Sequence, residues 1–315
     1  NPMVWALETV KRSTDEKEII RLTNEYKLPW EVVVPSVKKM TPGIWKALLE
    51  TMPYMAMLRN LATMERHGVF KDATVVKSTA SRLSDPKAVA NSKQLPFRFY
   101  NAYQAYEGNQ KVREALVAAL EESFVSMPEI PGMVCIANDV SGSMGGLVSD
   151  RGKARYCDIA GIFGAALLKK SADTILLPCD TEIMRIKVSR ADSIMTTAEK
   201  IGLAQGGTDL GVPIRHLIQN RIKVDHYIGI TDCEDWAGGY SRGFHNEWKT
   251  YRKLFPSARA YLVTIAPYRD GVSPIDDESC VSVYGWNDSV LSYISLMARG
   301  IGGQVDAVRK VELTK

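Results

Sequence analysis

The sequence lacks long hydrophobic runs, paired histidine motifs and a strong excess of either charge. No apolar run approaches the roughly 20 residues of a membrane span, and no signal peptide opens the chain, so we expect no membrane contact. The 40 Lys and Arg residues against 36 Asp and Glu residues leave a net charge of only +4. This balance permits a nucleic-acid partner without arguing for one, because basic tails and strongly basic stripes are absent.

Cysteine is also scarce. The 5 cysteines are odd in number and widely spread, and none forms a Cys-x-x-Cys pair. This pattern favours a reduced, cytoplasmic protein over a disulfide scaffold. A chain of 315 residues with 45% hydrophobic residues predicts two globular domains. Its first residues, Asn1 and Pro2, include no initiator Met, so we expect a fragment or a processed product.

The first part of the chain reads as short helices separated by proline. Thr41 is placed to cap a helix that begins at Pro42, and the other predicted helices cover residues 14–26, 30–40, 54–67, 73–83, 97–106 and 111–124. Helices this short, with brief connections, favour antiparallel pairs stacked in a solenoid. We therefore predict an α-helical repeat segment of the HEAT type over residues 1–130.

The pattern changes after the Pro- and Gly-containing segment 128–132. Predicted strands cover residues 133–137, 174–177, 183–188, 226–230 and 260–265. Predicted helices lie among them at residues 153–170, 209–220, 243–255 and 288–297. Alternation of strands and helices predicts a mostly parallel sheet with helices on both faces. Residues 131–315 are thus expected to form a doubly wound α/β domain.

Oxygen-bearing side chains follow the ends of these strands. An apolar strand stops at Asp139-x-Ser141-x-Ser143, Thr208 lies in a glycine-rich turn, and Asp232 ends a second strand. The carboxyl ends of parallel strands meet at one edge of the sheet, where α/β proteins bind ligands. Small hard cations prefer oxygen ligands. We therefore predict a divalent cation, Mg²⁺ before Mn²⁺ or Ca²⁺, held by Asp139, Ser141, Ser143, Thr208 and Asp232.

Two other interpretations of these residues stay open. The hydroxyls fit helix caps and the acids fit surface turns, and the complete ligand set is also compatible with a site that is structural or empty. A serine nucleophile lacks support, because there is no Gly-x-Ser-x-Gly motif and the four histidines, His67, His216, His226 and His245, show no motif pairing. We predict that the chain is not an enzyme.

By type and order, the five predicted ligands resemble the metal-ion-dependent adhesion site of von Willebrand factor A domains. The resemblance covers the chain from about residue 132 to its end. It implies that the serines and the threonine contact the metal directly, while the acids act through water or from behind the ligands. It also implies that a carboxylate from a partner protein fills the open position on the ion.

The helical half has a resemblance of its own. Residues 28–33, 45–49, 52–64 and 93–99 resemble the TROVE module of the Ro autoantigen and its bacterial Ro-like relatives. Residues 207–209, 231–239 and 284–286 resemble the second half of the same proteins, so the likeness covers essentially the whole chain. It implies a ring of helical repeats closed by the A domain. It also implies binding of small noncoding Y RNAs and of single-stranded 3′ ends of misfolded RNAs, and, in bacteria, tethering of an exoribonuclease.

The sequence departs from that family in length. A full module needs a longer helical half, so we expect its beginning to be missing here. Residues 1–130 hold 18 Lys and Arg against 15 Asp and Glu, a charge of about +3, which weakens the electrostatic argument. Candidate phosphate contacts are Lys38, Lys39, Arg59, Arg66, Lys71, Lys77, Lys93 and Arg98. Each also fits a solvated surface role, and Arg59 fits an anchor for helix packing.

Tryptophans offer a second means of contacting RNA, by stacking on bases. We expect Trp5, Trp30 and Trp45 to lie in the core, whereas Trp236 and Trp248 lie nearer the metal-edge loops and fit stacking better. Two hypotheses result. The first is a Ro-like RNA-binding ribonucleoprotein component that carries a divalent cation. The second is a metal-dependent protein-binding module, of the adhesion type, to which RNA is irrelevant.

Overall fold

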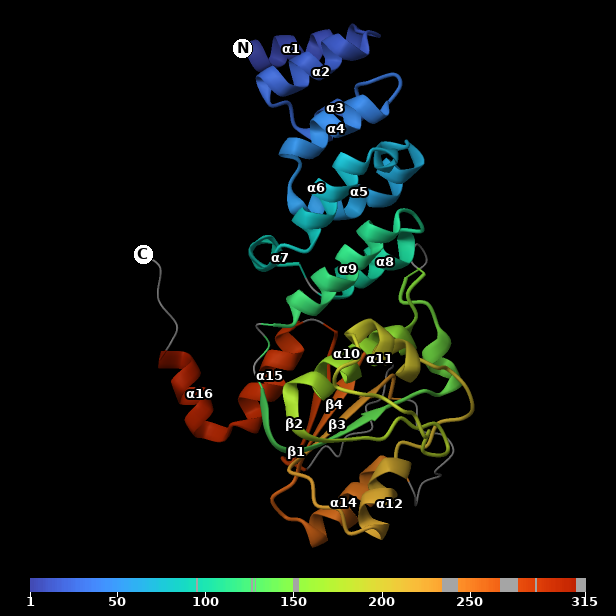
Figure 1. The fold of residues 1–315 in the computed structure, drawn as a ribbon. Coiled ribbons are helices and arrows are strands. Elements are labelled where there is room, and N and C mark those ends of the chain that lie inside the picture. Colours follow the sequence, from blue (N-terminus) through green and yellow to red (C-terminus); the bar gives the residue numbers. More distant parts are fainter. Residues whose placement is uncertain are drawn as a thin grey trace. The chain divides into compact units, whose positions relative to one another are not determined.

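The computed structural model describes residues 1–94, 96–125, 127, 129–149, 153–233, 243–266, 277–286 and 288–309. The chain divides into two compact units, Asn1–Ser123 and Phe124–Lys315, which are described here one by one (Figure 1). The division lies slightly before the boundary expected between residues 130 and 131. Among the described residues, no helix is both long and apolar enough to cross a membrane.

The first unit is helical throughout. Its elements are α1 (Pro2–Arg12), α2 (Glu16–Tyr26), α3 (Trp30–Val33), α4 (Pro42–Thr51), α5 (Tyr54–Arg66), η1 (Val69–Lys71), α6 (Ala73–Leu83), α7 (Pro86–Ser92), α8 (Pro96–Ala105) and α9 (Gln110–Ser123). Helices of this unit lie in successive layers, with α2 against α4, α6 against α9 and α8 against α9 (Figure 1). The predicted helical segment is confirmed, and its assignment to the HEAT type stays a prediction.

Capping residues and prolines set the helix boundaries. The Thr41 hydroxyl accepts a hydrogen bond from the Ile44 amide at 3.2 Å, and Pro42 occupies the first turn of α4, as predicted. The prediction of a helix over residues 30–40 is wrong beyond Val33. Val34 still has helical backbone angles, but Pro35 after it has no amide hydrogen to donate to the helix, so α3 is a single turn.

The tryptophans of this unit differ in burial. Trp45 lies in the core with 1% of its surface exposed, which confirms the expectation for that residue. Trp30 is half-buried. Trp5 is 55% exposed and packs by its edge on Tyr26, with 6.1 Å between ring centroids, so its placement in the core was wrong. Its apolar neighbours Met3 and Val4 are exposed as well, because Ala6 and Val10 supply the buried face of α1.

The second unit is built on a parallel sheet. Its described strands are β1 (Ile130–Asn138), β2 (Ser171–Leu176), β3 (His226–Thr231), β4 (Arg259–Thr264) and β5 (Cys280–Tyr284), in the order β2-β1-β3-β4-β5. Every neighbouring pair is parallel. Parallel neighbours need crossover connections. Here these include η2 (Gly142–Gly145), α10 (Tyr156–Lys170), α11 (Ile194–Ile201), α12 (Val212–Gln219) and α14 (Phe244–Leu254), and α15 (Asp288–Ala298) and α16 (Gly300–Arg309) follow β5.

Helices cover both faces of the sheet, with α10 and α11 on one side and α12 and α14 on the other (Figure 1). Successive residues of a strand point to opposite faces. Cys135 and Ala137 of β1 pack in one core with Trp248 and Tyr251 of α14. Alternating residues of the same strand are buried on the opposite face, which α10 covers. The doubly wound A-type fold is therefore confirmed.

Two strands and two helices of this unit were misjudged from the sequence. Residues 183–188 form no strand, and Ile183 makes just an isolated bridge to Cys179. Arg185 and Lys187 keep the alternation of a half-buried strand, but no described neighbouring strand continues the ladder there. The patterns of α11 and α16 were missed, as was the edge strand β5. All five cysteines are free thiols and buried, as expected for a chain without disulfides.

Candidate metal centre and nucleic-acid surface

Asp139 is fixed at the carboxyl end of the central strand. Its backbone amide donates to the Ile230 carbonyl of β3 at 2.9 Å, which continues the β1–β3 pairing to the strand end. One carboxylate oxygen, Oδ1, accepts from the Ser141 amide at 2.9 Å. The other, Oδ2, accepts from the Thr231 hydroxyl at 2.7 Å. With both oxygens held and 1% of its surface exposed, Asp139 organises the turn that follows it.

The two serines of the motif lie beside one another. Ser141 is fully buried, and its Oγ lies 3.1 Å from Oγ of Ser143 across the start of η2. Two hydroxyl oxygens at this separation, next to a buried carboxylate, present oxygen donors on one side of the turn. The structure thus brings Asp139, Ser141 and Ser143 together as the sequence predicts.

Backbone hydrogen bonds join the loop that carries Thr208 to this turn. The Gly142 amide donates to the Gly206 carbonyl at 3.2 Å, and the Gln205 amide donates to the Val140 carbonyl at 2.8 Å. Gly206 has φ +69°, and a Cβ there would overlap the carboxylate of Asp180. Only glycine combines this backbone with such a close approach. Thr208 is buried in the loop so formed.

Asp232 follows the last residue of β3 and is fully buried. Burial raises the pKa of Asp139 to about 6, hydrogen bonds from Ser141 and Thr231 oppose that shift, and the charge of Asp232 adds to it. The two carboxylates therefore repel one another at the same buried edge. A divalent cation would relieve that repulsion, and a donor set made of carboxylate and hydroxyl oxygens suits Mg²⁺. The residues present fit such an ion.

The roles of Thr231 and Asp209 at this edge were not foreseen from the sequence. Thr231 holds Asp139 and accepts from the Cys233 amide at 2.8 Å. The position of Thr231 directly before Asp232 was the signal in the sequence that could have revealed this role. Asp209, the acid that follows Thr208, accepts from the Gly211 amide at 3.0 Å and pairs with Arg215, so it serves the start of α12. Within the described residues there is no cluster of three His, Cys, Asp or Glu ligands, as expected where hydroxyls supply much of a donor set.

Among the described residues, no base is placed beside Ser141 or Ser143 as a serine nucleophile would need. The hydroxyls of Ser141 and Ser143 lie against one another, the Asp139 carboxylate accepts from Ser141, and none of the described histidines hydrogen-bonds to either hydroxyl. A base positioned next to the hydroxyl is what a serine nucleophile requires. The described geometry supports binding chemistry.

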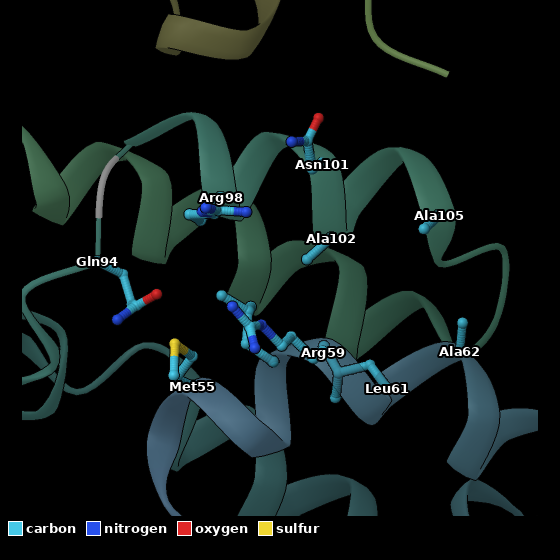
Figure 2. A pocket seen from close by; sticks show the side chains of 10 residues that line it. Met55, Arg59, Leu61, Ala62, Gln94, Arg98, Asn101, Ala102 and Ala105 are labelled. Carbon is cyan, nitrogen blue, oxygen red and sulfur yellow. The ribbon is translucent and has the colours of Figure 1, made fainter. Parts of the chain in front are cut away.

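On the helical unit, all eight predicted phosphate contacts are exposed. They are distributed over the loop after α3, over α5, η1, α6 and the end of α7, and over α8. Two of them come together: Arg59 of α5 and Arg98 of α8 line one pocket (Figure 2). Arg59 is exposed and has no hydrogen bond or ion pair to a described residue, so the described contacts give no support to the alternative that it anchors helix packing. For the other six, the structure shows exposure and no common site.

The proposed stacking tryptophans receive no support. Trp248 is fully buried in the α14 core, where its indole Nε1 donates to Ser279 Oγ at 3.1 Å, so its face is closed to a base. Trp236 lies outside the described residues, together with the surrounding segment 234–242. The expectation for Trp248 was therefore wrong. Its place among apolar and aromatic residues of an amphipathic helix was the overlooked signal of burial.

Comparison with protein families gives two matches that follow one another along the chain. Residues 24–132 match the TROVE domain, and residues 133–298 match the Ro60 vWA domain. The two matches meet between residues 132 and 133, close to the division between the two compact units.

Individual proteins give the same result. The chain is similar to the RNA-binding protein RO60 of Caenorhabditis elegans, with 26% identity over 91% of this chain and 46% of that protein. It is also similar to the RNA-binding protein RO60 of Deinococcus radiodurans, with 29% identity over 69% of this chain and 44% of that protein. The chain thus spans less than half of the length of these two relatives.

A solved structure supports the fold. The crystal structure of the Deinococcus radiodurans RO (RSR) protein superposes with a TM-score of 0.71 and covers 95% of this chain and 63% of that one. At 22% identity this likeness concerns the fold alone. It includes both the helical segment and the A-type domain.

Proposed function

Because the chain belongs to the Ro60 family, whose A-domain model matches more than half of it, we propose that it is an RNA-binding component of a ribonucleoprotein. The proposed ligands are small noncoding, Y-like RNAs and single-stranded 3′ ends of misfolded RNAs, and the proposed role is RNA quality control or processing. The observation that carries this proposal is the order of the two domain matches along the chain, TROVE and then Ro60 vWA, over residues 24–298. Two curated relatives that match most of this chain are named RNA-binding proteins.

The surface chemistry of the helical unit supports the proposal. Its eight exposed candidate cations stand on several helices, as a surface that follows a phosphate backbone requires. Net charge contributes little, since residues 1–130 carry only about +3. The binding we propose therefore depends on local placement of cations rather than on a strongly basic face.

For the α/β unit we propose a metal-ion-dependent adhesion site. Asp139, Ser141, Ser143, Thr208 and Asp232 would hold a divalent cation, Mg²⁺ before Mn²⁺ or Ca²⁺. The cation would neutralise the buried acids and offer a position for a carboxylate of a protein partner, such as an exoribonuclease. The support is the all-oxygen donor set and the hydrogen bonds that fix the turn. We propose binding and no catalysis, in a reducing cytoplasm that keeps the five thiols free.

A titration of the full chain tests the RNA-binding proposal. Fluorescence anisotropy would follow a labelled hairpin RNA that ends in a single-stranded 3′ tail, at about 50 and about 200 mM salt. We expect binding that weakens steeply with salt, because Lys and Arg contacts to phosphates release counterions. A folded chain that leaves this RNA unbound at the lower salt concentration would refute the proposal.

A further inference from the structure

A groove between α5 and α8 collects residues from one stripe of each helix. Met55, Leu58, Arg59 and Ala62 recur at helical spacing on α5, and residues of α8 with the same spacing stand opposite them (Figure 2). The cavity measures about 180 Å³. Its walls belong to the helical unit alone, so its geometry is set by the packing of α5 against α8.

The groove carries positive charge without a compensating acid. Arg59 and Arg98 are its charged lining residues, and neither forms an ion pair with a described carboxylate. The Arg98 guanidinium instead lies 4.9 Å from the centroid of the Phe97 ring, a contact that steadies the side chain while leaving its donors available. Two guanidinium groups with unused hydrogen-bond donors in one groove favour binding of an anionic ligand.

A second groove on the same unit provides a contrast. It lies along α4 and α6 and is larger, at about 400 Å³, and its basic residues are Lys46 and Arg82. Lys46 pairs with Asp72 at 2.7 Å, and Arg82 donates to the carbonyls of Leu49 and Met52. Both cations of that groove therefore bond to other residues of the fold. Arg59 and Arg98 of the α5–α8 groove form no ion pair with a described carboxylate.

Apart from the two arginines, Gln94 and Asn101, the residues that line the groove are apolar. Leu58 and Met55 form part of its wall, and Ala62 and Ala102 leave space where longer side chains would close it. Figure 2 shows the Ala102 methyl directed toward α5 and the Asn101 amide directed away from it. The volume is below the roughly 300–1,000 Å³ of sites that enclose a whole small molecule. The groove therefore suits one unit of a longer ligand.

We propose that the α5–α8 groove is a subsite for one unpaired nucleotide of RNA. Arg59 and Arg98 bind its phosphates, and the base lies against the apolar wall formed by Met55 and Leu58. This inference rests on the proposed RNA-binding function and names the place where single-stranded RNA is held. Arginine suits the role because its fork of donors matches phosphate oxygens and its plane stacks on bases. A methionine sulfur adds favourable contact with an aromatic ring.

An acidic peptide is the alternative ligand of matching charge. Its carboxylates would satisfy the guanidiniums, but an Asp or Glu side chain brings no flat apolar group for the space beside Ala102. A nucleotide supplies the anion and the flat group in one unit. The nucleotide is therefore the ligand that uses the whole groove.

Two variants of the full chain test the proposal by different physical routes. Arg59→Gln with Arg98→Gln removes both charges, and Lys17→Gln with Lys87→Gln is the control that removes the same charge from exposed positions elsewhere on the unit. Ala102→Leu keeps both arginines and fills the groove. Its control is Ala90→Leu, at an exposed position of α7. Circular dichroism melting checks that each variant is folded.

The probes are a fluorescein-labelled oligouridylate and a blunt hairpin RNA without single-stranded residues. We expect both groove variants to bind the oligouridylate about tenfold more weakly than their controls, with little change for the hairpin. The arginine pair should also lower the salt slope for the oligouridylate by about 1.4, which corresponds to two phosphate contacts on a single strand.

Each other outcome has a separate meaning. If wild type binds both RNAs and the groove variants match their controls, the subsite is wrong while the proposed function stands. If folded wild type binds neither RNA, the proposed function fails and the subsite with it. If an oligoglutamate peptide displaces the oligouridylate from wild type but not from the arginine pair variant, the groove is a peptide site and the nucleotide assignment is overturned.

Discussion

In the helical unit the polar side chains proposed for function are exposed and spread over several helices and loops, whereas in the α/β unit most of them are buried at one edge of a sheet. The difference follows from architecture. Short helices in layers each turn one face outward, so cations spread over the surface. Parallel strands all end at the same edge, so residues far apart in sequence gather there. Buried Asp139 and exposed Arg59 illustrate the two cases.

That difference determines what a mutation should do. A buried oxygen cluster is held by the fold, so changing it alters stability and ligand binding together. An exposed arginine without partners contributes little to folding, so changing it alters binding alone. Hydrogen exchange, measured peptide by peptide in the full chain, separates the two units in one experiment.

Replacing a core tryptophan should give the largest effect. Trp248→Ala removes a fully buried ring that packs between Tyr227 and Tyr251, so we expect the free energy of unfolding of the α/β unit to fall by about 3–5 kcal/mol. Trp5→Ala in the helical unit is the matched control, with an expected loss below about 1 kcal/mol because that ring is exposed. Equal losses at the two positions would contradict the burial described here.

Adding a divalent cation should affect one unit only. With free Mg²⁺ at about 100 times its Kd, we expect the α/β unit to gain about 2.7 kcal/mol, since the ion binds the folded state. Exchange in peptides of the helical unit should be unchanged. Asp139→Asn should abolish the gain, whereas Glu182→Gln, an exposed acid on the same unit, should preserve it. A wild type that responds to none of Mg²⁺, Mn²⁺ and Ca²⁺ would remove the cation site from consideration.

Two glycines with left-handed backbone sharpen the comparison further. Gly206→Ala should cost more than the about 1–2 kcal/mol of a left-handed non-glycine residue, because the new Cβ also meets Asp180. It should weaken the Mg²⁺ response as well, since it displaces the loop of Thr208. Gly68→Ala in the helical unit has a similar φ of +72°, but its Cβ would make only ordinary van der Waals contact with the Lys71 side chain, so it should show the backbone cost alone. If Gly68→Ala proved the costlier change, crowding at Gly206 would be ruled out.

The smallest effect concerns pH. Burial lowers the pKa of His226, which begins β3, and nearby Arg259 adds to the shift while Asp225 opposes it. The unfolded chain then binds this proton more readily than the folded one. The contribution of neutral His226 to stability is therefore present above about pH 6.5 and is lost as pH falls below it. His226→Gln should flatten this part of the stability profile of the α/β unit, with His67→Gln on the helical unit as the control. Parallel profiles for wild type and His226→Gln would contradict the assignment.

The same contrast explains what the sequence could predict. The order of Asp139, Ser141 and Ser143 after an apolar strand was sufficient to predict the turn, because strand ends leave few alternatives for such residues. Thr208 could be placed from its glycine-rich loop. Thr231 was missed because it reads as one more strand residue, and its hydrogen bond to Asp139 depends on the pairing of β1 with β3.

In the helical unit, periodicity and capping residues predicted most helices but not their partners. That Arg59 and Arg98 share a groove depends on how α5 packs on α8, which no local pattern specifies. Two errors had local causes. Pro35 ended the helix predicted over residues 30–40, and the Asp85-Pro86 start of α7 was overlooked although Asp85 accepts from the Ala88 amide at 2.7 Å.

The buried thiols have a practical consequence. Burial raises the pKa of Cys157 to about 11 and that of Cys280 to about 12, and thiol reagents attack the thiolate. We therefore expect all five native thiols to react slowly with maleimides while the chain is folded. One cysteine introduced on the surface, as in Ser81→Cys on α6, would become the single attachment point for a dye or spin label. Site-specific labelling of the folded chain should therefore need no prior replacement of the five native cysteines.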